Sequence, residues 1–132
     1  MASSGQLGQT GTTVPGSLHH VSLEIAPADG ERFAELLDAI GFDPIDSPEA
    51  LGGSVRWFDG GGTQVHLILT EGATAPALGH AAFAVTQFAQ TLDALRQRGF
   101  EVEEARQLWG ERRAFVLAPG GHRLEVMAAP PA

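Results

Sequence analysis

Two histidines of this chain stand in similar segments and have the chemistry of metal ligands. His20 lies in Leu18–Ile25 (LHHVSLEI), and His80 occupies the matching position of Leu78–Val85 (LGHAAFAV). Both segments alternate apolar and polar or small residues, the pattern of a half-buried strand. The two histidines fall on the face opposite the larger apolar side chains. Neutral imidazoles in such positions are suitable ligands for a divalent metal.

A second pair of segments repeats in the same way. Residues 61–68 (GGTQVHLI) resemble residues 120–127 (GGHRLEVM), and His66 in the first matches Glu125 in the second. The sequence therefore contains two half-length repeats, each with ligand-capable residues at equivalent positions. A repeat of this kind predicts that the fold consists of two similar structural units.

The rest of each repeat predicts the elements that hold these residues. Apolar residues recur at helical spacing over Phe33–Ile40 and again over Phe88–Leu95. A glycine follows both stretches, Gly41 in the first repeat and Gly99 in the second, as is common at helix ends. Each half therefore reads as a strand, a helix and three further strands, with the helix covering the apolar face of its sheet.

The predicted fold class is α+β: two βαβββ modules that form a curved, eight-stranded, open barrel-like sheet with a concave metal cleft. We expect one domain at residues 17–129, with module one at 17–69 and module two at 78–129. Residues 1–16 and 130–132 are predicted to be flexible tails because of their composition.

Composition excludes several classes of partner. The net charge of −8 argues against nucleic acid, which needs clustered Lys and Arg, and against an acidic membrane surface. The absence of cysteine excludes disulfides and thiolate metal sites. No apolar run is long enough for a membrane helix, and residues 1–16 lack the pattern of a signal peptide. The expected location is cytoplasmic.

The paired repeats resemble the vicinal oxygen chelate superfamily, which includes glyoxalase I, fosfomycin-resistance transferases, extradiol dioxygenases and bleomycin-binding proteins. The resemblance covers about Leu18–Met127. It implies four metal ligands, His20, His66, His80 and Glu125. Three imidazoles and one carboxylate suit Ni, Zn, Fe or Co better than Mg or Ca.

The resemblance also implies an activity and an assembly. The expected function is a metal-dependent, glyoxalase-like lyase or isomerase that binds a small substrate through vicinal oxygens and stabilises an enediolate or related oxyanion. Glu125 or His66 would move the proton, although His66 could also be a pocket residue. A homodimer is expected, and whether the cleft forms within one chain or across the dimer stays open.

Further residues are candidates for the substrate pocket. Arginines could pair with an anionic substrate, aromatic rings could form a wall, and a glutamine shares the ligand face; ordinary packing or solvation explains them equally well. His122 follows a tight turn and is expected to be exposed. The pocket candidates are Arg56, Trp57, Gln64, Trp109, Arg113 and Phe115.

The departures from individual families leave alternatives open. The chain has no tyrosine and no lysine, which weakens a ring-cleaving dioxygenase and a fosfomycin transferase, and Glu24 stands where glyoxalase I usually has Arg. The alternatives are a bleomycin-resistance-like module that binds a small molecule without turnover, or a dioxygenase-type oxidoreductase. The sequence names neither substrate nor metal.

Overall fold

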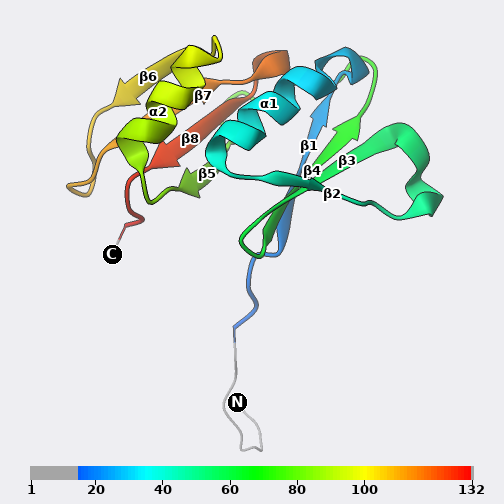
Figure 1. Cartoon of the computed structure of the whole chain (residues 1–132), viewed down its shortest axis with the longest axis horizontal. Coiled ribbons are helices and arrows are strands. Elements are labelled where there is room, and N and C mark those ends of the chain that lie inside the picture. Colours follow the sequence, from blue (N-terminus) through cyan, green and yellow to red (C-terminus); the bar gives the residue numbers. More distant parts are fainter. Residues whose placement is uncertain (1–14, 132) are drawn as a thin grey trace, which may run out of the picture.

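A computed structural model describes residues 15–131, so most of the predicted N-terminal tail and the last residue of the C-terminal tail lie outside the described residues. The two modules contain the elements that the repeats predict (Figure 1). Module one contains β1 (His20–Ile25), α1 (Gly30–Ile40), β2 (Asp43–Ile45), β3 (Val55–Gly60) and β4 (Thr63–Leu69). Module two contains β5 (Ala81–Ala84), α2 (Phe88–Gln97), β6 (Val102–Ala105), β7 (Arg113–Leu117) and β8 (Arg123–Met127). Short 3-10 helices occupy Pro27–Asp29, Glu49–Ser54 and Pro119–Gly121.

The strands form two four-stranded sheets of equivalent topology. Their orders are β1-β4-β3-β2 and β5-β8-β7-β6, so the first and last strand of each module lie side by side. The pairs β1–β4 and β5–β8 are parallel, and the remaining pairs are antiparallel. The α+β fold of two βαβββ modules is confirmed, as two curved sheets rather than a closed barrel. Neither α1, α2 nor any shorter helix within residues 15–131 is long and apolar enough to cross a membrane.

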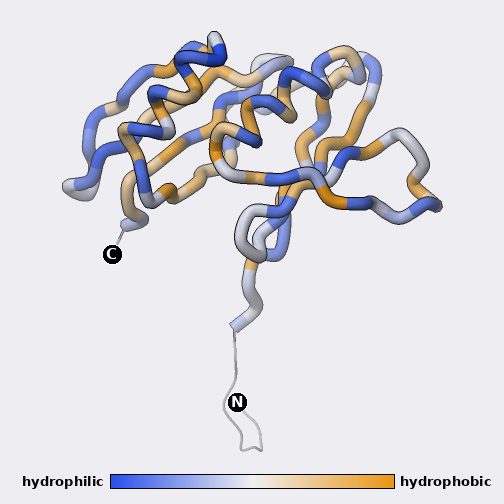
Figure 2. The backbone as a smooth tube through the Cα atoms, viewed as in Figure 1, coloured by the Kyte–Doolittle hydropathy of each residue, from blue (hydrophilic) through white to orange (hydrophobic). Residues whose placement is uncertain are grey.

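One hydrophobic core joins the two modules. Leu37 of α1 and Leu95 of α2 are both fully buried, in one cluster with apolar residues of both sheets. The two helices lie next to each other over the sheets (Figure 1), and the guanidinium of Arg98 links them through Asp38 Oδ2 at 2.8 Å. Hydrophobic residues follow the strands beneath the helices, whereas the edge strand β6 is mostly hydrophilic (Figure 2). Both helices therefore cover the apolar faces of their sheets, as predicted.

His122 corrects one expectation. It is buried, at 5% relative exposure, and its Nε2 donates a hydrogen bond to the backbone carbonyl of Glu24 at 2.8 Å. Its ring also meets the edge of Phe33 at 6.0 Å between centroids. The prediction of an exposed residue was wrong because His122 reaches across from module two to β1 and α1 of module one.

Replacing His122 by Ala should lower the free energy of unfolding by about 1–3 kcal/mol, because the Glu24 carbonyl loses its partner at a buried module boundary. Urea denaturation followed by circular dichroism measures this change. The matched control is His19→Ala, since His19 is exposed, and it should change stability by less than about 0.5 kcal/mol. Equal stability of the two variants would contradict a structural role for His122.

Candidate metal centre

The predicted ligands lie on the sheet faces that the helices leave uncovered. In module one, His66 of β4 pairs in register with Ser22 of β1, so its side chain shares a face with His20. In module two, Glu125 of β8 pairs with Ala82 of β5, two residues after His80. Side chains two apart on a strand point the same way. The register therefore gives each module one pair of ligand-capable residues on the face away from its helix.

The pair in module two has the chemistry of half a metal site. His80 Nδ1 lies 3.0 Å from the backbone carbonyl of Leu78, which can only accept, so Nδ1 carries a proton. If the imidazole is neutral, Nε2 then carries a lone pair and no proton. Nε2 lies 3.1 Å from Glu125 Oε1. Two electron-rich atoms at this separation need a proton or a cation between them. Glu125 is buried, which makes that requirement stronger.

The 3.1 Å separation also suits a metal ion. Two neighbouring donors of an octahedral ion are about 3.0 Å apart when each bond is about 2.1 Å long. His80 Nε2 and Glu125 Oε1 are therefore already spaced as two donors of one ion. A carbonyl that fixes the tautomer of the imidazole is a common arrangement behind metal-binding histidines.

The pair in module one is arranged differently. The rings of Trp57, His66 and His20 form a stack, with centroids 3.9 Å apart for Trp57 and His66 and 4.1 Å apart for the two histidines. His66 Nε2 lies 2.8 Å from Gln64 Oε1. The lone pairs of stacked rings run side by side and do not converge on one point. For both histidines to bind one ion, at least one ring must turn about its side-chain bonds.

The electrostatics of this stack keep His66 neutral. Burial lowers the pKa of His66 below its ordinary value, and the neighbouring charges of His20 and His19 lower the pKa further. An imidazole that stays unprotonated at pH 7 is available as a ligand or a hydrogen-bond acceptor.

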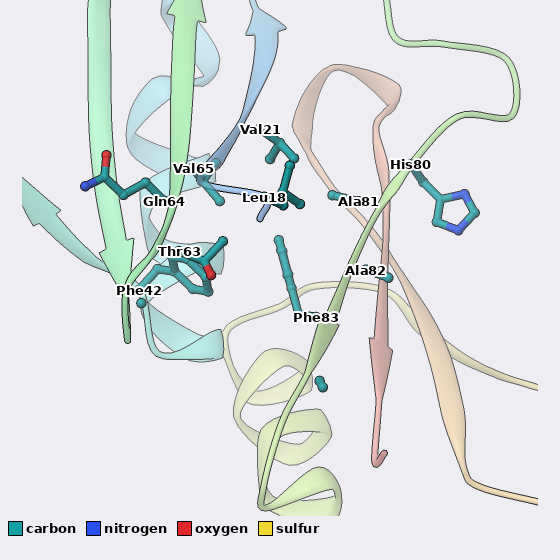
Figure 3. A pocket seen from close by; sticks show the side chains of 12 residues that line it. Leu18, Val21, Phe42, Thr63, Gln64, Val65, His80, Ala81, Ala82 and Phe83 are labelled. Carbon is teal, nitrogen blue, oxygen red and sulfur yellow. The ribbon is translucent and has the colours of Figure 1, made fainter. Parts of the chain in front are cut away.

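The two pairs do not meet within one chain. Among residues 15–131, no three His, Cys, Asp or Glu side chains lie close enough together to hold a metal. In Figure 3, Gln64 beside His66 points to one side and His80 points to the other, both away from the space between β4 and β5. Within the described residues, one chain thus presents its two pairs of ligand-capable residues on separate faces.

The pocket candidates fall into three groups. Gln64, Trp57 and Phe115 lie on the ligand faces, where Phe115 meets the His80 ring edge-on at 5.2 Å between centroids. Arg113 lies on the same face and binds Glu125 at 3.2 Å. The sequence predicted Arg113 only as an anchor for an anionic substrate, and its bond to Glu125 follows from the register of β7 against β8.

The other two candidates lie elsewhere. Arg56 is on the face that α1 covers, where its NH1 bonds to Glu31 Oε1 at 2.7 Å, so it is not beside His66. Trp109 lies in the loop before β7, where its Nε1 donates to the carbonyl of Ala129 at 2.9 Å. Its ring centroid lies 5.8 Å from the guanidinium carbon of Arg113, which is on the ligand face.

A pocket of about 380 Å³ lies between the modules, lined by residues of β1, β4 and β5 and by Phe42 (Figure 3). Apolar side chains such as Val21, Val65 and Phe83 form most of its wall. His80 and Gln64 reach only its rim. The pocket therefore belongs to the module boundary and not to either pair of ligand-capable residues.

In the metal-free protein, His66 should titrate at a lower pH than an ordinary histidine, because its ring is covered. The measurement is an NMR titration of the imidazole resonances. Trp57→Ala uncovers one face of the ring and should raise the pKa of His66 toward its ordinary value, whereas Trp109→Ala should leave it unchanged. A His66 pKa at or above the ordinary value in the wild type would contradict this account of the stack.

Solved structures share this fold. A protein described as belonging to the glyoxalase family, from Bacillus anthracis, superposes with a TM-score of 0.77 at 24% identity, covering 88% of this chain and 97% of that one. A fosfomycin resistance protein from Mesorhizobium loti gives 0.68 at 15% identity, covering 89% and 95%. A bleomycin resistance determinant encoded on transposon Tn5 gives 0.64 at 14% identity, covering 85% and 97%. These likenesses establish the fold alone.

Family-level similarity extends over nearly the whole chain. No protein of curated function matches the sequence. The model of one family matches residues 17–126, which contain both sheets and all four predicted ligands. The chain therefore belongs to the Glyoxalase/Bleomycin resistance protein/Dioxygenase superfamily.

Proposed function

We propose that the protein is a divalent-metal-dependent enzyme of the glyoxalase type, a lyase or isomerase, with Ni, Zn, Fe or Co as its metal. The observation that carries the proposal is the pair His80 Nε2 and Glu125 Oε1, which lie 3.1 Å apart, the spacing of two donors of one metal ion. A proton on Nε2 would make this contact an ion pair, and a metal ion between the two atoms would be held by the same geometry.

The active site is completed by a second copy of the chain. Because the two half-sites of one chain face apart, His80 and Glu125 need His20 and His66 from elsewhere, and an identical chain offers them. Leu18 and Leu78, at matching positions beside His20 and His80, are 70% and 80% exposed. Large apolar residues at repeated exposed positions favour an interface. The proposed assembly is therefore a homodimer with two equivalent sites.

Each residue then has a stated task. His80, Glu125 and His20 would hold the metal, and His66 would join them after turning out of its stack. A bound metal would supply Lewis-acid stabilisation of negative charge on the vicinal oxygens of a small substrate. Glu125, displaced from the metal, would move a proton between neighbouring carbons through Oε1, and His66 is the second candidate for this role. Trp57 and Phe115 would form the two walls of the substrate cleft.

The metal ligands can be tested by titration. The wild type should bind Zn²⁺ or Co²⁺, His80→Ala should lose about 100-fold or more in affinity, and His66→Gln should lose less, because Gln still offers an oxygen. Isothermal titration calorimetry and metal analysis measure this, followed by turnover assays with α-oxoaldehydes, acyl thioesters and catechols. A wild type that binds flat small molecules but no metal would instead be a binding module without turnover.

Complementation tests whether the site crosses the dimer. His20→Ala and His80→Ala chains should each bind little metal alone. After unfolding and refolding in an equal mixture, half of the dimers should be mixed, and each should have one intact site of two. The mixture should therefore regain about a quarter of the wild-type metal capacity. No gain on mixing, or a monomer in light scattering at micromolar concentration, would reject a shared site.

A further inference from the structure

Arg113 lies at the centre of the module-two half-site. Its side chain is 12% exposed, on β7 beside β8, and its NH1 bonds to Glu125 Oε2 at 3.2 Å. The other oxygen of the carboxylate, Oε1, faces His80. The two oxygens of Glu125 therefore have separate partners, one on each side.

The guanidinium is itself held by groups outside both ligand pairs. Its Nε donates to the backbone carbonyl of Arg106 at 3.0 Å. Its carbon lies 5.4 Å from the centroid of the Phe115 ring and 5.8 Å from that of Trp109. The loop that contributes Arg106 and Trp109 is in turn tied to the C-terminal segment by the Trp109–Ala129 bond. These contacts fix the orientation of the Arg113 guanidinium.

We infer that Arg113 is a positioning residue that reserves Glu125 Oε2, so that Glu125 binds the metal through Oε1 alone. A carboxylate free to rotate could offer both oxygens to one ion or turn away from His80. Arginine suits this role because its rigid fork donates to two acceptors in one plane, the Arg106 carbonyl and Glu125. Lysine carries the same charge but lacks this geometry. The inference rests on the proposed metal site.

This geometry directs two donors of Arg113 to groups of the protein. Its Nε and NH1 are both engaged by the protein before any substrate binds. Its contribution should therefore be visible in metal binding with no substrate present. A residue that acts only on an anionic substrate would leave metal binding unchanged.

The test compares Co²⁺ binding by wild type, Arg113→Lys and Arg113→Met without substrate. Residues that hold a metal ligand typically contribute 10–100-fold to metal affinity. We expect a loss of about this size for Arg113→Met and a smaller loss, about tenfold, for Arg113→Lys. Both variants should also change the visible absorption of bound Co²⁺, because the carboxylate can then bind through two oxygens. A merely structural role would not move this spectrum.

The control is Arg112→Met. Arg112 is the neighbouring residue in sequence, but it is exposed and pairs with Glu104 on β6, which raises the pKa of Arg112 and lowers the pKa of Glu104. It should bind Co²⁺ as the wild type does. Circular dichroism and thermal unfolding check each fold, and Arg113→Lys, which keeps the buried charge, carries the test if Arg113→Met does not fold.

The outcomes separate the inference from the proposed function. No Co²⁺ binding by the wild type would reject the metal site itself. Wild-type binding together with an unchanged affinity and spectrum in Arg113→Lys and any folded Arg113→Met would overturn the positioning role alone. Weaker binding with an altered spectrum in the Arg113 variants, and not in Arg112→Met, would establish it.

Discussion

The two-residue period of a β-strand is the constraint on which this structure depends. Along β1, β4, β5 and β8 one set of side chains enters the shared core, and the alternate set carries His20, His66 and Glu125. A shift of one residue in any of these strands would exchange the two sets. Because α1 and α2 pack together over a single core, the core-facing sides of both sheets turn toward the helices. The ligand faces are left outside, one on each module.

The two pairs of ligand-capable residues differ in how firmly the protein holds them. In module two a carbonyl, a carboxylate and a guanidinium fix His80 and Glu125 from several directions, and every charge there has a partner. These partners are needed because an unpaired buried charge would lower the stability of the fold. In module one the histidines lie in an aromatic stack and keep more freedom to turn. A metal would therefore bind one rigid pair of ligands, His80 and Glu125, and one more adaptable pair, His20 and His66.

Much of this arrangement could be predicted from the sequence, because it follows from local patterns. Alternation around His20 and His80, helical spacing from Phe33 to Ile40, and the repeat itself gave the elements and their faces. The relative direction of the two faces could not be predicted, since it depends on how α1 and α2 pack. Nor could the burial of His122, whose partner, Glu24, is 98 residues away in sequence. The Arg113–Glu125 bond needed the register of β7 against β8.

A site divided between two copies would couple metal binding to assembly. A ligand that binds the dimer but not the monomer stabilises the dimer by mass action. By the same linkage, the apparent metal affinity of such a protein falls when dilution separates the copies. His80 and Glu125 are already in contact within one chain, so this coupling would act mainly through His20 and His66. The stack with Trp57 would then limit how easily His66 binds the metal. His66 must leave Trp57 and Gln64 before its Nε2 is free.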